Sequence, residues 1–347
     1  MFARLVGNQR AQEILRRMLS SNRVPGALLF AGEDGVGKKL FAVELAKSLN
    51  CRSLAGVEAC DRCPVCQRIA QFNLPPADDN DANKQILWSE HRDVGLLRPA
   101  GRAITVQQIR ELERETNFRP FEGRARVFIL EDADRLNEAA SNALLKTLEE
   151  PHPTAYLILL TSRPASLLPT IRSRCQVVRF APLAAREIEE YLVSQRKRSG
   201  EEARLASHLA RGRLGLALEI NIDHYRKRRD AMLDVIDALA GQKTDRGQLL
   251  RAAENLSDAK MKDEYEPRLD VLETLVHDVW LLSLDAPGAR LVNDDLRERL
   301  EPLSRGIQSR RAAQWLARIE ELRGQLAVNI NRRIATDALF LAMAENQ

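Results

Sequence analysis

"GALLFAGEDGVGKK" (26–39) decides the fold of this chain. Its first half is a continuous apolar run that ends in glycine, which is typical of a strand buried on both faces of a parallel sheet. Its second half, "GEDGVGKK" (32–39), matches the G-x-x-x-x-G-K phosphate-binding pattern and leads into the helical stretch "KKLFAVELAKSLN" (38–50). A strand, a glycine loop and a helix in this order favour a nucleotide-binding loop over the alternative, a chance glycine turn.

The residues of this loop predict ATP binding without good metal binding. The glycines Gly32, Gly35 and Gly37 let backbone N–H groups curl around phosphate oxygens, and Lys38 would reach the outer phosphates. The next position normally carries a serine or threonine hydroxyl that coordinates Mg²⁺, but this chain has Lys39, which offers no oxygen. We therefore expect that ATP binding is possible, that Mg²⁺ binding is doubtful, and that hydrolysis is inefficient.

A second apolar run, "RVFIL" (126–130), ends in the carboxylates Glu131 and Asp132. Beside a phosphate loop, such carboxylates would hold Mg²⁺ and polarise a water molecule. An active ATPase of this kind usually has aspartate before glutamate, so the order here shifts both carboxylates by about one methylene. An acidic helix N-terminus, favoured by the helix dipole, is an equally good interpretation.

Alternating strands and helices predict an α/β fold with a parallel sheet over residues 1–182. "AYLILLT" (155–161) is a third buried-strand run, and "NEAASNALLKTLEEP" (137–151) between the second and third runs reads as a helix stopped by proline. After "FAPL" (180–183) helical periodicity takes over, with a small unit over 183–225 and a longer one over 230–347. Apolar stripes predict that the helices of the longer unit pack on each other or on partners; they are Leu269, Leu272, Val276, Val279 and Leu282, and Leu316, Ile319, Leu322 and Leu326.

The composition limits the broad class of the protein. A chain of 347 residues is too long for one ordinary core. No apolar run is long enough to cross a bilayer, and the first residues lack the basic and apolar blocks of a signal peptide, so we expect a cytoplasmic protein with no membrane partner. A net charge of +4 permits a nucleic-acid partner but does not require one.

Four of the five cysteines, Cys51, Cys60, Cys63 and Cys66, fall within sixteen residues. In a reducing compartment such crowding indicates a metal site more than disulfides. Four thiolates are enough for a closed tetrahedral Zn²⁺ site, which would be structural because it leaves no open position. The zinc module would cover about residues 51–70. An iron–sulfur cluster and unmetallated thiols are the alternatives.

Several stretches together resemble the subunits of the bacterial DNA polymerase III clamp loader, most closely those of the delta-prime type. The resemblance rests on the four cysteines and on these stretches: "LVGNQRAQEIL" (5–15), "RVPGALLFAGEDGVGKK" (23–39), "LEDADRLNEAASNALLKTLEEP" (130–151) and "LLPTIRSRC" (167–175). It covers roughly the first 180 residues strongly, and "NINRR" (329–333) is a weaker match.

The resemblance implies an AAA+ fold, with a nucleotide-binding domain over 1–182, a helical lid over 183–225 and an all-helical collar over 230–347. It also implies that the collar joins this chain to the clamp-loader ATPase and delta subunits in a hetero-oligomer, which we expect to be a pentamer. A sliding clamp and primer–template DNA would be partners of that complex.

The family likeness gives a role to the arginine of "SRC". In this family it reaches across an interface into a neighbour's ATP site, where a guanidinium faces the γ-phosphate, so Arg174 would act in trans. Without the motif, Arg172 and Arg174 would read as surface charges. By the same likeness Thr161, with Ser162 as second choice, could sense a γ-phosphate, while Gly215 stands where a motor subunit usually has a phosphate-sensing arginine.

These departures predict a non-motor subunit. It would assist ATP-dependent loading of the sliding clamp, with its own ATPase weak or absent, and would count as enzymatic only as part of the DNA-directed DNA polymerase III holoenzyme. The alternatives are a gamma/tau-like motor with Lys38 and Asp132 catalytic, and a zinc-containing nucleic-acid-binding module that uses the basic run "RKRR" (226–229).

Overall fold

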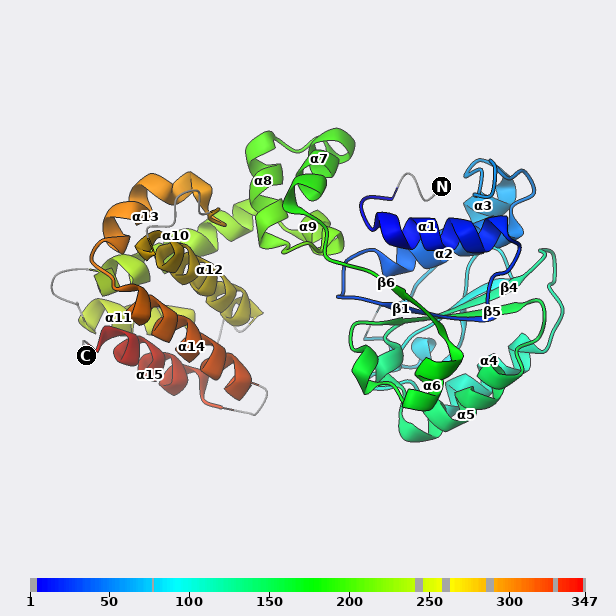
Figure 1. Ribbon diagram of the computed structural model, residues 1–347. Helices are drawn as coiled ribbons and strands as arrows, with labels where there is room; N and C mark the ends of the chain where they lie inside the picture. Colours follow the sequence, from blue (N-terminus) through cyan, green and yellow to red (C-terminus); the bar gives the residue numbers. More distant parts are fainter. Residues whose placement is uncertain are drawn as a thin grey trace. The chain divides into compact units, whose positions relative to one another are not determined.

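A computed structural model describes residues 5–76, 78–240, 246–257, 263–284, 290–326 and 330–345 (Figure 1). The chain divides into two units, Met1–Arg198 with Ala210–Leu218, and Ser199–Leu209 with Glu219–Gln347. The second unit therefore includes a helix from within the expected lid. The expected three-part division with boundaries near 182 and 225 stays a prediction.

The first unit contains a six-stranded sheet in the order β2-β3-β4-β5-β1-β6. In this sheet β2 runs antiparallel to β3, and the other described strand pairs are parallel. The three predicted apolar runs form the central strands β1, β4 and β5, so the expected parallel α/β sheet is confirmed. The strands are β1 (Ala27–Ala31), β2 (Leu87–Trp88), β3 (Val94–Leu97), β4 (Arg126–Leu130), β5 (Ala155–Thr161) and β6 (Gln176–Arg179).

Helices cover both faces of this sheet. In Figure 1, α1 and α2 lie on one face and α4, α5 and α6 on the other. The predicted helix before Pro151 is α5, which is capped at its N-terminus by Asn137, whose side chain accepts the N–H of Ala140. The helices are α1 (Gln9–Ser20), α2 (Lys38–Asn50), α3 (Pro64–Ile69), α4 (Val106–Thr116), α5 (Glu138–Glu149), α6 (Pro169–Arg174), α7 (Ala185–Arg196) and α9 (Leu214–Glu219).

The second unit is helical throughout its described residues. Positions of the predicted apolar stripes, such as Leu272, Val276 and Ile319, are fully buried where α12 packs against α10, α13 and α14. The helices are α8 (Gly200–Leu209), α10 (Ile222–Ala240), α11 (Arg246–Leu256), α12 (Tyr265–Ser283), α13 (Arg297–Ser304), α14 (Ser309–Leu326) and α15 (Arg332–Ala344).

Within the described ranges, no helix combines the length and the apolar character needed to span a membrane. The first residue of "NINRR", Asn329, lies outside the described residues, whereas Asn331 caps α15 by accepting the N–H groups of Arg333 and Ile334.

Candidate nucleotide pocket, arginine surface and metal centre

A cavity of about 550 Å³ opens beside the phosphate loop, in the first unit. It brings together six of the predicted nucleotide-site residues, whereas Gly32 and Thr161 are not in its wall. Sequence reasoning missed Tyr191 and Arg196, because nothing local in α7 marks its end as part of a pocket. The wall consists of Asp34, Gly35, Gly37, Lys38, Lys39, Leu40, Glu131, Asp132, Leu160, Tyr191, Arg196, Leu214, Gly215 and Leu218.

The glycines of the loop are required by its backbone. Gly35 and Gly37 have φ values of +79° and +99°, a left-handed conformation that side chains disfavour. A Cβ on Gly32 would lie 2.4 Å from the carbonyl oxygen of Phe180. The loop therefore has the tight curvature expected of a phosphate loop.

Lys38 is buried, and its ammonium is bonded to the loop itself. Its Nζ donates to the carbonyl oxygens of Gly32 at 2.5 Å and Glu33 at 2.7 Å, and lies 3.3 Å from the Asp34 carboxylate. A phosphate would have to replace these contacts. In the described conformation, Lys38 is turned back on the loop.

Lys39 pairs with one of the carboxylates that would otherwise bind a metal. Its Nζ lies 2.9 Å from Oε1 of Glu131. Asp132 is the other carboxylate, and burial together with the neighbouring charges of Asp34 and Glu131 raises its pKa. The pairing of Glu131 with Lys39 would have to break before that carboxylate could coordinate Mg²⁺.

The start of α9 lies directly on the phosphate loop. The N–H of Gly215 donates to the carbonyl oxygen of Gly35 at 2.9 Å. A Cβ at position 215 would lie 3.2 Å from the Cα of Gly35, so a side chain there would require a shift of a few tenths of an ångström between the loop and α9. Gly215, which was predicted to replace the phosphate-sensing arginine of a motor subunit, makes a close backbone contact with the loop.

Thr161 is engaged in a buried network with a residue that sequence reasoning missed, Asp134. Its hydroxyl donates to Asp134 at 2.7 Å and accepts the N–H of Arg163 at 3.0 Å. The Arg163 guanidinium completes the network by forming an ion pair with Asp134, in which Nη2 lies 2.7 Å from Oδ2. A role for Thr161 in sensing phosphate stays a prediction, and it would require rearrangement of this network.

Replacing Asp134 with asparagine should lower the free energy of unfolding by about 1–3 kcal/mol at pH 7. Burial alone would raise the pKa of Asp134, but hydrogen bonds from Thr161 and Arg163 outweigh it and lower the pKa below its ordinary value of 3.8. The carboxylate therefore stabilises the fold above that pH, and the contribution is lost as the pH falls through the folded-state pKa. Urea unfolding at pH 7 gives the cost of the substitution, and unfolding between about pH 4 and about pH 2 follows the loss of the contribution.

The matched control for this variant is Asp81→Asn, because the Asp81 carboxylate is exposed and, within the described part of the chain, is paired with its neighbour Lys84. It should leave stability nearly unchanged. Equal stability of Asp134→Asn and the unmodified chain at pH 7 would contradict the structural role of the network.

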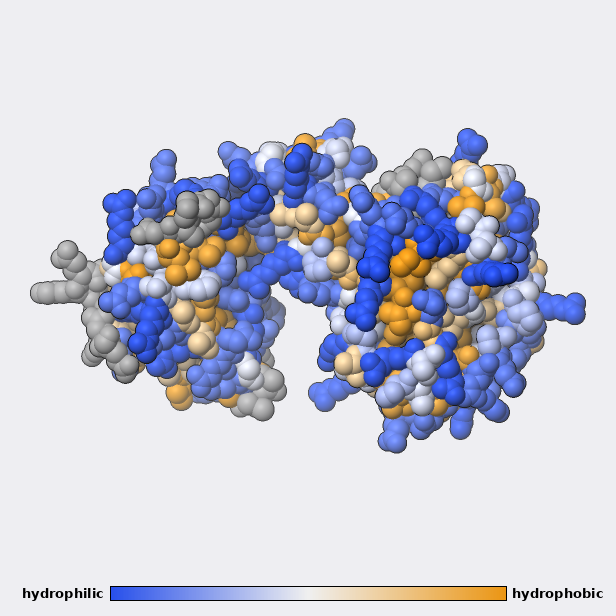
Figure 2. Space-filling view, viewed as in Figure 1, coloured by the Kyte–Doolittle hydropathy of each residue, from blue (hydrophilic) through white to orange (hydrophobic). Residues whose placement is uncertain are grey.

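Arg174 lies at the surface, away from the cavity wall. It ends α6 and its side chain is 34% exposed. Its Nη1 donates to the carbonyl oxygen of Thr170 at 3.0 Å, and its Nη2 to the Glu149 carboxylate of α5 at 2.6 Å. The strand that follows, β6, is an edge of the sheet, and Figure 2 shows hydrophobic residues gathered where β1 and β6 lie. The guanidinium is therefore accessible to another molecule.

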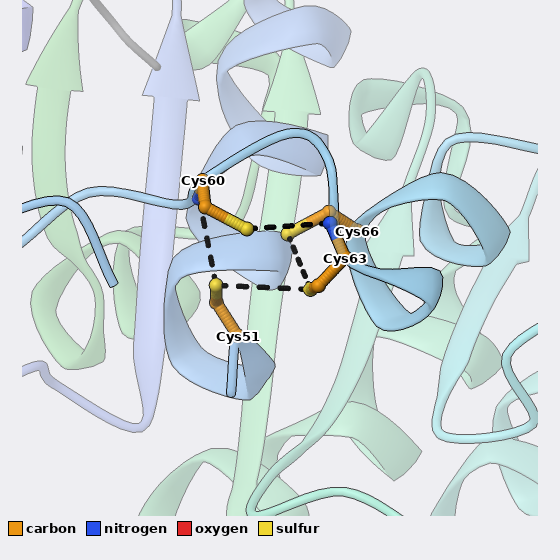
Figure 3. Close-up of side chains that lie close together, drawn as sticks. All are labelled: Cys51, Cys60, Cys63 and Cys66. Atoms are coloured by element: carbon orange, nitrogen blue, oxygen red, sulfur yellow. Dashed lines mark hydrogen bonds between the residues drawn. The ribbon is translucent and has the colours of Figure 1, made fainter. Parts of the chain in front are cut away.

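The four predicted cysteines come together at the end of α2 and the start of α3 (Figure 3). Their sulfur atoms all lie within 4.8 Å of one another, with Cys51 3.9 Å and Cys66 3.5 Å from Cys63. These distances exclude disulfides. Hydrogen bonds from backbone N–H groups lower the pKa of Cys60 to about 6, and that of Arg62 has the largest effect. The lower pKa favours the thiolate form of Cys60. The cluster could hold one metal ion.

Comparison with known proteins gives matches along most of the chain. A family model described as "DNA polymerase III, delta subunit" matches residues 7–184, and a model of the C-terminal part of the delta subunit matches 224–343. The DNA polymerase III subunit delta′ of Bacillus subtilis is 28% identical over 337 residues, 97% of this chain and 96% of that protein. The subunit tau of Escherichia coli is 32% identical over 216 residues, 62% of this chain and 31% of that protein. Among solved structures, a gamma subunit-related protein from Thermotoga maritima is 18% identical, with a TM-score of 0.42 and coverage of 96% of this chain and 98% of that chain.

Proposed function

The chain belongs to the DNA polymerase III delta subunit family, and from this premise we propose that it is a delta-prime-type, non-motor subunit of a clamp loader. It would help load a sliding clamp on primed DNA while a neighbouring subunit hydrolyses ATP. Its own contribution to that hydrolysis would be Arg174, delivered to the neighbour's γ-phosphate.

A single contrast carries this proposal. In the chain's own pocket, the ammonium of Lys39 lies 2.9 Å from Glu131, at the carboxylate that a metal would need. Outside that pocket, the Arg174 guanidinium is partly exposed and, in the residues that the structure describes, is bonded to Glu149 and a backbone carbonyl. A chain whose metal-binding carboxylate is paired with a lysine, but which presents an arginine at its surface, is suited to assist a neighbour's hydrolysis.

The cysteine cluster supports a structural Zn²⁺. Four Zn–S bonds of about 2.3 Å in tetrahedral geometry put neighbouring sulfur atoms about 3.8 Å apart, and the two distances here, 3.5 and 3.9 Å, bracket that value. The zinc ion would join the end of α2 to the segment that carries the other three thiols. Since reduced thiols are needed, we place the protein in the cytoplasm.

The expected partners follow from the relatives. Because the matches include subunits named delta′ and tau of DNA polymerase III, we propose a hetero-oligomer with the ATPase and delta subunits, joined through the helices of the second unit. The sliding clamp and primer–template DNA would be bound by the whole complex.

The isolated chain should show no measurable ATP turnover with Mg²⁺. Added to the purified ATPase and delta subunits, it should raise their clamp- and DNA-dependent turnover at least about tenfold, because one ATP site would gain its arginine. A steady-state phosphate-release assay measures both quantities. Turnover by the chain alone that Lys38→Ala abolishes would favour the gamma/tau-like motor instead.

A further inference from the structure

The turn between α4 and β4, residues 117–124, carries two exposed aromatic side chains. Phe121 is 75% and Phe118 58% exposed, and Phe121 is the most exposed large hydrophobic residue in the described part of the chain. They border a groove of about 770 Å³ together with Trp88, Arg92, Arg119 and other residues. Such aromatic exposure beside a groove is a feature of interaction sites more than of free surfaces.

The backbone of this turn is firmly held. Asp93 is fully buried, and its carboxylate accepts the N–H groups of Phe121 at 2.6 Å, Glu122 at 2.9 Å and Gly123 at 2.7 Å. Hydrogen bonds to a buried charge are among the stronger ones in proteins. The hydrogen-bonded backbone of the turn therefore holds Phe121 at the surface. Because the backbone is already ordered, a partner that binds Phe121 would lose little conformational entropy in the turn.

Two residues next to the cysteines also hold this turn. Asn50, which immediately precedes Cys51, accepts the N–H groups of Arg124 at 2.8 Å and Ala125 at 3.0 Å. Arg68 of α3, two residues after Cys66, forms an ion pair with Glu122. Any metal held by the cysteines would fix both anchors and, through them, the turn.

The charges in the groove indicate the chemistry of the partner. Arg92 stacks on Phe121, 5.6 Å from the ring centre, and neither it nor Arg119 is paired with a carboxylate among the described residues. Arg126 is already paired with Glu115 at 2.8 Å. Glu90 also lines the groove, so the surface is not uniformly positive and is a poor match for a polyphosphate backbone. Two free guanidiniums around an apolar centre fit an interface with a protein that carries carboxylates at its rim.

We propose that the 117–124 turn is a docking surface for a protein partner that packs apolar side chains against Phe118 and Phe121 and places carboxylates against Arg92 and Arg119. The inference rests on the proposed function only for the choice of proteins to test. The turn presents the aromatic anchors, and the cysteine module holds the turn in place.

Binding of the full-length chain to three purified probes, the ATPase subunit, the delta subunit and the sliding clamp, tests the proposal. Phe121→Ala should weaken binding to one of these proteins at least about tenfold, and Phe118→Ala combined with it about a hundredfold. Arg119→Glu should weaken the same binding, with a smaller effect at high salt. Because these side chains are exposed, the variants should fold normally, which circular dichroism checks. The matched control is Leu74→Ala, an exposed leucine outside the groove, which should have no effect.

Two results would overturn the proposal. One is unchanged affinity for all three proteins in the double phenylalanine variant. The other is loss of binding to a single-stranded oligonucleotide alone, which would make the turn a nucleic-acid surface. Arg174→Ala, measured alongside, separates this inference from the proposed function, because it should lower ATP turnover without changing the binding that depends on Phe121.

Discussion

Arg174→Ala should reduce single-turnover ATP hydrolysis at the adjacent subunit's site by about 10³-fold, with little effect on assembly of the complex. A guanidinium at the γ-phosphate stabilises charge that develops in the transition state, and no other group of this chain is proposed to replace it. The present partner of Arg174 is the exposed carboxylate of Glu149, at 2.6 Å. A surface pair of this kind is worth about 1 kcal/mol or less, so a triphosphate can readily displace Glu149.

The controls for this experiment lie on the same helix. Arg172→Ala removes an exposed arginine two residues away and should leave hydrolysis unchanged. Arg174→Lys keeps the charge but loses the planar fork, so it should retain only part of the activity. If Arg174→Ala hydrolyses ATP as fast as the unmodified complex, or if Arg172→Ala is equally slow, the proposed role of Arg174 is wrong.

The sequence was sufficient for features that depend on neighbouring residues. The buried runs of β1, β4 and β5 predicted a parallel sheet, because each is apolar on both faces. The spacing of the cysteines predicted their cluster, since three of the four fall within seven residues, 60–66. The glycine loop was likewise recognisable from its own residues, and Gly35 and Gly37 have the left-handed conformations that such a loop needs.

Features that depend on contacts between distant residues could not be predicted. Lys39 was expected only to interfere with metal binding. In the structure it also forms an ion pair with Glu131, which directly follows β4. Nothing in the sequence distinguishes Asp134 from the acidic residues beside it, but it is the centre of the Thr161 network. The turn over 117–124 gave no local signal, because its anchors Asn50, Arg68 and Asp93 come from three separate segments.

Loss of the metal ion proposed for the cysteine cluster should strongly destabilise the first unit. Cys60→Ser combined with Cys63→Ser should abolish binding of one Zn²⁺ per chain and lower the free energy of unfolding of the first unit by about 4 kcal/mol or more, because metal binding and folding are coupled. Elemental analysis of the purified chain gives the metal content, and urea unfolding at pH 7 gives the stability. Iron in place of zinc, with visible absorption, would instead support the iron–sulfur alternative.

The same double variant separates a local role of the metal from a wider one. Cys175→Ala is the matched control, since it removes a buried thiol outside the cluster and should retain the zinc. Because Asn50 and Arg68 hold the turn before β4, metal loss should accelerate hydrogen exchange at the amides of residues 121–125 more than at those of β1, which is covered by strands on both sides. Equal acceleration throughout the sheet would mean that the metal supports the whole unit, and that the turn has no special dependence on it.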